Sequence, residues 1–154
     1  MTEQIEELRP PAEVRWADEL AVLARADVEA AADIPPGWRL SPTAVRRFII
    51  GDAALGVSRK FYGDDPLVDR AIVSLLGRQG LMLVGEPGTA KSMLSELLAA
   101  AISGTSNLTI QGSAGTTEDH IRYSWNYALL IAQGPSEQAL VPSPVYQAMA
   151  RGAV

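Results

Sequence analysis

The sequence predicts an α/β fold in which helices flank a parallel sheet, with an α-helical N-terminal extension. Two short apolar runs that are typical of strands, LMLV at 81–84 and NLTIQG at 107–112, flank a helix-forming stretch, MLSELLAAAI at 93–102. This order favours a right-handed crossover within a parallel sheet. Ligands bind outside the carboxyl ends of such strands, and GEPGTAKS at 85–92 lies at that point here.

The N-terminal segment 13–32 is rich in Ala and Glu and predicts an amphipathic helix. We interpret it as a solvated helix packed on the side of the main domain, in preference to a dedicated partner-binding helix. The sequence IPPGWRLSP at 34–42 then breaks the pattern. We expect this linker to separate a helical extension, residues 1–57, from a core, residues 58–154. The apolar residues at helical spacing in the first segment are Val14, Ala17, Ala21, Ala24 and Val28.

Two cap-plus-proline signals predict the next helices. Ser41 is the expected N-cap of a helix from Pro42 to Ile50 that ends at Gly51. Asp65 and Pro66 give the same signal for a second helix, which Gly77 and Gly80 close before the first strand. The apolar residues of this second helix are Val68, Ile72, Val73 and Leu76.

A further helix is predicted for EDHIRYSWNYALLIAQ at 118–133, after the helix from Lys91 stops near Ser103-Gly104. Thr116 or Thr117 is its N-cap, with Asp119 giving a capping-box-like start. His120 has no set of ligand residues at metal-binding spacing, so we interpret it as a surface or capping residue and assign no metal to it. We interpret the aromatic residues, including Tyr123 and Tyr127, as packing and not as a base-stacking platform. The expected buried face contains Ile121, Trp125, Leu129 and Ala132.

Composition excludes several classes of protein. The net charge is −5; residues 1–33 hold nine acids and three arginines, which gives −6 and leaves +1 for the remainder, so nonspecific nucleic-acid binding is not expected. The chain has no cysteine, which excludes disulfides and cysteine-based metal sites. No apolar stretch approaches the roughly 20 residues that span a bilayer, and the N-terminus is acidic where a signal peptide is basic. We therefore expect no membrane association and a cytoplasmic location.

The stretch 85–92 has the residues that a polyphosphate site requires. Backbone N–H groups of a glycine-rich turn form a concave nest for an anion, and the following helix points its positive dipole end there. Lys91 would reach the terminal phosphates, and the Ser92 hydroxyl would complete the coordination of Mg²⁺. Ala90 replaces the last glycine of G-x-x-x-x-G-K-[ST], which we expect to be tolerated because the residue has a helical, negative φ. An ordinary strand-to-helix turn is the alternative. The residues assigned to the site are Gly85, Glu86, Pro87, Gly88, Thr89, Ala90, Lys91, Ser92 and Met93.

GEPGTAKS, with Ala before the lysine, resembles the P-loop of the MoxR-like branch of the AAA+ ATPases. KFYGDDPLVDRAI at 60–72 looks like the segment before the P-loop in that family, where an aromatic or apolar residue and a glycine lie close to the adenine. The matching residues here are Phe61, Tyr62 and Gly63. Residues 110–154 look like the part between the second strand and the Walker B strand. The resemblance covers roughly 58–154 and implies a P-loop NTPase fold with an incomplete AAA+ core.

The resemblance implies ATP and Mg²⁺ as ligands, and ATP hydrolysis coupled to remodelling or activation of a partner protein. It also implies a homo-oligomer, a hexameric ring in the complete protein, and a partner with a von Willebrand factor type A domain. Hydrolysis further needs Walker B acids, a polar sensor and an arginine from a neighbouring subunit, and no such motif follows Ser92. We therefore read the chain as the N-terminal part of a longer ATPase, or a truncated product of one, that binds ATP without turnover.

Two alternatives remain open at this point. The chain is instead a non-hydrolysing nucleotide sensor or assembly module that docks through the Trp125 face, or it is a small-molecule kinase. The kinase is disfavoured because such enzymes usually keep the glycine that Ala90 replaces. A set of substrate-binding acids or arginines is also missing from the sequence.

Overall fold

The computed structural model describes residues 9–77 and 79–153, which form two compact units, Met1–Ser106 and Asn107–Val154. We describe each unit by itself. The boundary that we expected after residue 57 lies inside the first unit, so the N-terminal helices and the loop at 85–92 belong to the same compact body. No helix in the described ranges is long and apolar enough to cross a membrane.

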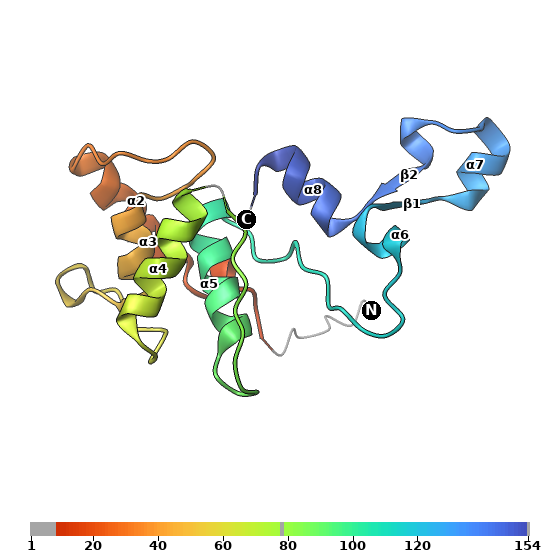
Figure 1. The fold of residues 1–154 in the computed structure, drawn as a ribbon. Helices are drawn as coiled ribbons and strands as arrows, with labels where there is room; N and C mark the ends of the chain where they lie inside the picture. The colour runs from red at the N-terminus through yellow and green to blue at the C-terminus, as the bar shows by residue number, and fades with distance from the viewer. Residues whose placement is uncertain (1–8, 78, 154) are drawn as a thin grey trace, which may run out of the picture. The chain divides into compact units, whose positions relative to one another are not determined.

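Helices make up the first unit, with α3 at its centre (Figure 1). They are α1 (Ala12–Arg15), α2 (Ala17–Glu29), α3 (Pro42–Ile50), α4 (Asp65–Leu76) and α5 (Lys91–Ser103), with the 3₁₀ turn η1 (Ala53–Leu55) after α3. Helix α3 contacts α2, α4 and α5, and α1 contacts α5. The largest fully buried side chains come from α2, α3, α4 and α5: Leu23, Val45, Phe48, Ile49, Val68, Leu94, Leu97, Leu98 and Ile102.

The predicted N-terminal helix is present, but it is interrupted at Trp16 and buries a different face. Val14 and Val28 of the predicted stripe are 62% and 79% exposed. The side chain of Leu23 is fully buried instead, and Trp16 and Leu20 pack against the core. These larger side chains remove more apolar area from water than the alanines do, so they decide which face turns inward.

The cap predicted for α3 is confirmed. The Ser41 hydroxyl accepts a hydrogen bond from the Ala44 N–H at 3.1 Å, Pro42 is the first helical residue, and the helix ends at Gly51. The Asp27 carboxylate accepts bonds from both the backbone N–H and the hydroxyl of Ser41, each at 2.7 Å. Because Asp27 is on α2, the same pair of groups fixes the start of α3 and ties it to α2.

The N-cap of helix α4 lies one residue before the predicted cap, Asp65. Asp64 occupies the N-cap position, Asp65 is the first helical residue, and Gly77 follows the helix as expected. Val68 and Ile72 of the predicted apolar face are buried, whereas Val73 is 67% exposed. The face of α4 that meets α3 is therefore narrower than the sequence pattern indicated.

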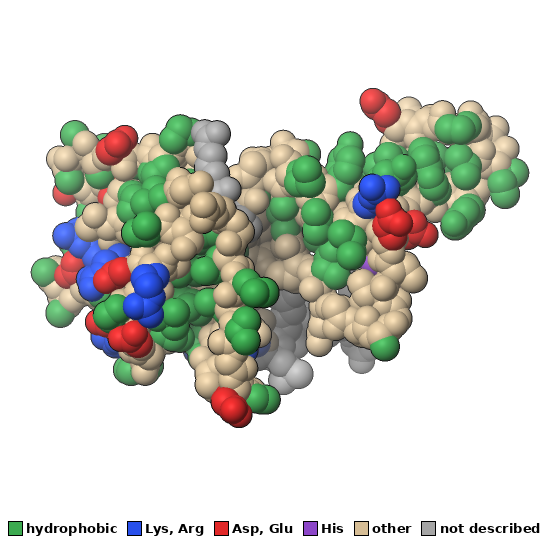
Figure 2. Space-filling model, in the orientation of Figure 1, with side chains coloured by type: hydrophobic (Ala, Val, Ile, Leu, Met, Phe, Trp, Pro, Cys, Tyr) green, Lys and Arg blue, Asp and Glu red, His purple; other side chains and the backbone are tan. Residues whose placement is uncertain are grey.

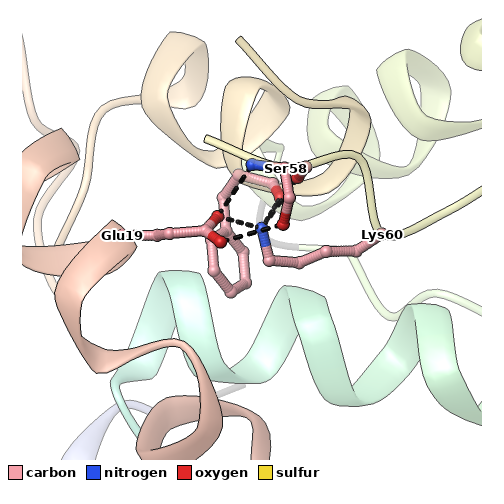
Figure 3. A network of polar contacts seen from close by, with 4 residues as sticks. Glu19, Ser58 and Lys60 are labelled. Carbon is pink, nitrogen blue, oxygen red and sulfur yellow. Dashed lines mark hydrogen bonds and ion pairs between the residues drawn. The ribbon is translucent and has the colours of Figure 1, made fainter. Parts of the chain in front are cut away.

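A buried lysine joins three parts of the first unit (Figure 3). The Lys60 side chain is 1% exposed, and its ammonium contacts the Glu19 carboxylate at 2.5 Å. It also donates to the backbone carbonyls of Phe48 at 3.0 Å and Ser58 at 2.9 Å. Glu19 in turn accepts bonds from the Ser58 N–H at 3.1 Å and hydroxyl at 2.8 Å. Helix α2, helix α3 and the segment before α4 are thus held by one network.

The charges in this network shift the pKa values of both partners. Burial lowers the pKa of Lys60, and the neighbouring Glu19 only partly opposes this. Burial alone would raise the pKa of Glu19, but the hydrogen bonds from Lys60 and Ser58 outweigh it and leave that pKa below its ordinary value. The lowered pKa of Lys60 thus follows from loss of water around its charge, and the lowered pKa of Glu19 from the hydrogen bonds to its carboxylate.

The second unit contains a β-hairpin with a helix between its strands. Its elements are α6 (Glu118–Ile121), β1 (Tyr123–Trp125), α7 (Tyr127–Gln133), the 3₁₀ turn η2 (Glu137–Ala139), β2 (Leu140–Pro142) and α8 (Pro144–Arg151). Strands β1 and β2 are antiparallel, with Tyr123 opposite Pro142 and Trp125 opposite Leu140. Ser143 caps α8 and also donates to the carbonyls of Ile121 and Arg122.

The single helix predicted over 118–133 is therefore wrong. Strand β1 divides it because Tyr-Ser-Trp has strong β-propensity and pairs with a partner near residue 141, which periodicity within 118–133 does not reveal. The expected face is consequently spread over three elements, and Ile121 is 45% exposed. His120 does have the capping role, since its Nδ1 accepts from the Thr117 N–H at 3.1 Å in the position we gave to Asp119.

The predicted parallel sheet is not observed in the part of the chain that the structure describes, where β1 and β2 form the sheet. Residues 81–84 and 107–110 have no assigned strand. Leu81 and Leu83 nevertheless pack against the core, while Met82 and Val84 are 84% and 83% exposed. This alternation is that of a strand, but a strand forms only when a neighbouring chain segment accepts and donates its backbone hydrogen bonds.

We predict that Glu19→Gln lowers the free energy of unfolding by about 2 kcal/mol, because it leaves the buried ammonium of Lys60 without its counter-charge. Urea unfolding followed by circular dichroism measures this. Glu29→Gln, an exposed position on the same helix, is the matched control. The double variant Glu19→Gln/Lys60→Met should recover part of the loss. Equal free energies of unfolding for Glu19→Gln and Glu29→Gln would contradict the role given to Glu19.

Candidate phosphate-binding loop

The loop Gly85–Ala90 is exposed and leads directly into α5. The first bond of that helix runs from the Leu94 N–H to the Ala90 carbonyl at 2.9 Å. Within the described ranges, no backbone N–H from Gly85 to Met93 donates to another protein group. Because Pro87 has no N–H, these nine residues offer eight backbone donors, and they lie at the positive end of the α5 dipole.

Lys91 lies over this loop. Its ammonium donates to the carbonyls of Gly85 at 2.8 Å and Glu86 at 2.5 Å, and to the Thr89 hydroxyl at 3.0 Å. The Thr89 hydroxyl itself donates to the Glu86 carbonyl at 2.8 Å. All three ammonium protons are therefore used by the loop. A phosphate that enters the nest would replace these neutral acceptors with charged oxygens, which form stronger hydrogen bonds with an ammonium.

Ala90 corrects one expectation about the loop. Its φ is 58° and its ψ is 24°, which is the left-handed region and not the helical, negative φ that we expected. Gly88 also has a positive φ, 80°. A Cβ in this region approaches the following carbonyl oxygen at a cost of roughly 1–2 kcal/mol. Ala90 thus retains the backbone shape that a glycine would adopt, with added strain.

Ser92 and Met93 begin α5 with different orientations. Ser92 is exposed, and its hydroxyl makes no hydrogen bond within the described residues. A single hydroxyl at a helix N-terminus, next to a phosphate nest, fits Mg²⁺, which keeps most of its waters and takes few protein ligands. Met93 packs its side chain against the core, so what it presents to the loop is its backbone N–H.

The residues expected near the adenine, Phe61, Tyr62 and Gly63, lie just before α4. Tyr62 is 83% exposed, whereas its neighbour Phe61 is 5% exposed and belongs to the core. Gly63 is required there because a Cβ at that position would lie 2.3 Å from Cε1 of the Phe61 ring. Helices α4 and α5 both begin at the lower end of the first unit in Figure 1. The structure therefore presents Tyr62 and Gly63 from the start of α4, and Lys91 and Ser92 from the start of α5.

Sequence reasoning missed the residues that hold Tyr62 in place. Lys60 and Arg59 precede the aromatic pair, and the structure gives each a specific set of partners. Lys60 is one of two lysines in the chain, the other being Lys91. Lysine is rarely buried, so the sequence by itself did not indicate that Lys60 lies inside.

We predict that Ala90→Gly raises the free energy of unfolding by about 0.5–1 kcal/mol, because relief of left-handed strain exceeds the entropy that glycine adds to the unfolded chain. Ala99→Gly, the same substitution inside α5, should lower it by about 1 kcal/mol. Urea unfolding of the two variants side by side checks the opposite signs. A loss of stability in both would show that Ala90 does not have a positive φ.

Two comparisons show what the chain is similar to. Residues 80–154, slightly less than half of the chain, match the family model of the AAA domain, dynein-related subfamily. The chain is also 60% identical over 146 residues to the uncharacterized protein YehL of Escherichia coli strain K12. That alignment covers 95% of this chain and 40% of the relative, so the chain spans less than half the length of this relative. No solved structure matches.

The family match begins just before LMLV and includes the exposed loop, Lys91, Ser92 and the whole of α5. The match does not distinguish a MoxR-like branch from other members. Over residues 80–154 the chain is therefore similar to an AAA domain of the dynein-related subfamily.

Proposed function

We propose that residues 85–93 bind the phosphates of ATP. The observation that carries this proposal is the set of unpaired backbone N–H groups at the start of α5, with the Lys91 ammonium lying over them. Backbone donors and the helix dipole favour a polyanion, and the lysine adds a full positive charge. The family match over residues 80–154 supports a nucleotide as the source of these phosphates.

Ser92 is the residue that we propose as the protein ligand to Mg²⁺. When bound, Mg²⁺ neutralises part of the phosphate charge and fixes the geometry of the polyphosphate. The chain itself contributes the free hydroxyl of Ser92, the nest of N–H groups and the Lys91 charge. We further propose that Tyr62 and Gly63 contact the adenine, because they lie exposed at the start of α4, which begins at the same end of the unit as α5.

For the complete protein we propose a MoxR-like AAA+ ATPase that works as a homo-oligomeric ring and couples ATP hydrolysis to remodelling or activation of a partner. A protein with a von Willebrand factor type A domain is a candidate partner. We also propose that residues 81–84 form a strand of a parallel sheet. The inward Leu81 and Leu83, which alternate with the outward Met82 and Val84, support this arrangement.

Replacing Lys91 tests the site directly. We expect Lys91→Ala to lower ATP affinity roughly tenfold to a hundredfold, because a charge-assisted phosphate contact worth about 1.5–3 kcal/mol is removed. Isothermal titration calorimetry with Mg²⁺ present measures the change. Arg46→Ala, which removes an exposed cation that is paired with Asp69 of α4 and makes no contact with the loop, is the control. Unchanged affinity in Lys91→Ala would exclude the loop as the phosphate site.

The 154-residue chain is expected to bind ATP without measurable turnover. No apolar run followed by paired acids occurs after Ser92 in this sequence, and an arginine finger alone contributes about 10³ to 10⁵ in rate where it has been dissected. A steady-state phosphate-release assay, run beside Lys91→Ala, measures the activity. Release clearly above that variant would mean that an acid such as Glu86, Glu118 or Asp119 supplies the missing function.

A further inference from the structure

The segment 58–62 directs its side chains alternately to opposite sides. Ser58 and Lys60 both reach Glu19 on α2. Arg59, between them, reaches the other way, toward Asp65 in the first turn of α4. The backbone is fixed as well, because the N–H groups of Lys60 and Phe61 both donate to the Ile49 carbonyl, at 3.0 and 3.1 Å. The segment that ends at Tyr62 is therefore held from two sides.

Arg59 makes three contacts around Tyr62. Its Nε donates to the Phe61 carbonyl at 2.9 Å, and its Nη2 forms an ion pair with the Asp65 carboxylate. Its guanidinium carbon lies 5.9 Å from the centre of the Tyr62 ring. A planar guanidinium makes such contacts at once because its donors are fixed in a fork and its face stacks on an aromatic ring. Tyr62 is thus covered on one side by Arg59 while 83% of its surface is exposed.

The exposure of Arg59 and Asp65 separates two possible roles of this ion pair, a contribution to global stability and the positioning of Tyr62. The side chains of Arg59 and Asp65 are 34% and 36% exposed. Figure 2 shows Lys, Arg, Asp and Glu side chains interleaved over the α3 and α4 side of the first unit, so this pair is one of several there. Ion pairs this exposed contribute little to global stability. The specific contacts to Tyr62 and to the Phe61 carbonyl are what Arg59 adds beyond its neighbours.

We propose that Arg59 is a positioning residue that holds Tyr62, across the start of α4, in the orientation that receives the base of the bound nucleotide. This proposal rests on the proposed function, namely that residues 85–93 bind ATP. The proposal assigns the phosphates to residues 85–93 and no phosphate contact to Arg59. Its effect reaches the ligand through the Tyr62 ring, whose uncovered face is available for stacking on a base.

The test compares two ligands that share the phosphates and differ in the base. Calorimetry with Mg²⁺ measures the affinity of the 154-residue chain for ATP and for inorganic tripolyphosphate. We expect Arg59→Ala to weaken ATP binding about threefold to tenfold and to leave tripolyphosphate binding unchanged. Lys91→Ala should weaken both. Arg46→Ala, which removes another arginine from an exposed ion pair with an aspartate, should weaken neither.

Two further variants separate positioning from loss of structure. Arg59→Lys keeps the charge but loses the planar fork, so its ATP affinity should fall nearly as far as that of Arg59→Ala. In the background Tyr62→Leu, Arg59→Ala should cause no additional loss of ATP affinity, because both substitutions remove the same contact. Thermal unfolding should change little in either Arg59 variant.

Several outcomes would overturn the proposal. If Arg59→Ala lowers the affinities for ATP and tripolyphosphate equally, Arg59 acts at the phosphates. If Arg59→Ala leaves ATP affinity unchanged, Arg59 has no part in binding. Additive losses for Arg59→Ala and Tyr62→Leu would show that the two residues act independently. If the unmodified chain binds tripolyphosphate but gains nothing from the base, the phosphate site stands and the Arg59 proposal fails. If it binds neither ligand, the proposed function fails first, and this proposal fails with it.

Discussion

The arrangement of the first unit depends on the burial of Lys60. An ammonium that is 1% exposed needs a partner for each of its protons, and Lys60 finds them in Glu19 and in the carbonyls of Phe48 and Ser58. These partners come from α2, α3 and the segment before α4, so satisfying one charge fixes three elements. The Trp16 and Phe48 rings lie 5.5 and 4.4 Å from the ammonium and add favourable cation–π contact. The position of Tyr62 follows from this constraint, because its segment is fixed at Lys60 and Phe61.

Features that depend on neighbouring residues could be predicted from the sequence. The Ser41 cap, the proline at the start of α3, the glycine ends of α3 and α5, and the loop before Lys91 are all set within a few residues of chain. Features that depend on distant partners could not. The buried face of α2 is chosen by packing on the core, β1 exists because it pairs with β2, and the φ of Ala90 is set by the loop as a whole. The strand predicted at 81–84 belongs to the second kind, because alternation indicates it but only a neighbouring strand would complete it.

The two ends of helix α5 differ in how many of their backbone groups have hydrogen-bond partners in the protein. At the carboxyl end of α5 the protein supplies partners: the Arg39 N–H donates to the Ile102 carbonyl at 2.7 Å, and Gly104 ends the helix with a φ of 74°. Just beyond, Glu13 accepts bonds from the N–H and hydroxyl of Ser106, and these hydrogen bonds outweigh burial and lower its pKa. The amino end has no such partners among the described residues.

This asymmetry explains why the loop suits a polyanion. The rest of α5 is anchored by Leu94, Leu97, Leu98 and Ile102 in the core, so the helix does not need its amino end to be capped. The N–H groups without a protein partner and the left-handed backbone of Ala90 lie at that one end, beside the Lys91 ammonium that the loop carbonyls hold. A bound phosphate would accept hydrogen bonds from the N–H groups and would give the ammonium charged oxygens in place of the neutral acceptors of the loop. The N–H groups find a partner other than water only when the anion is present, so their pairing stabilises the complex and not the free chain.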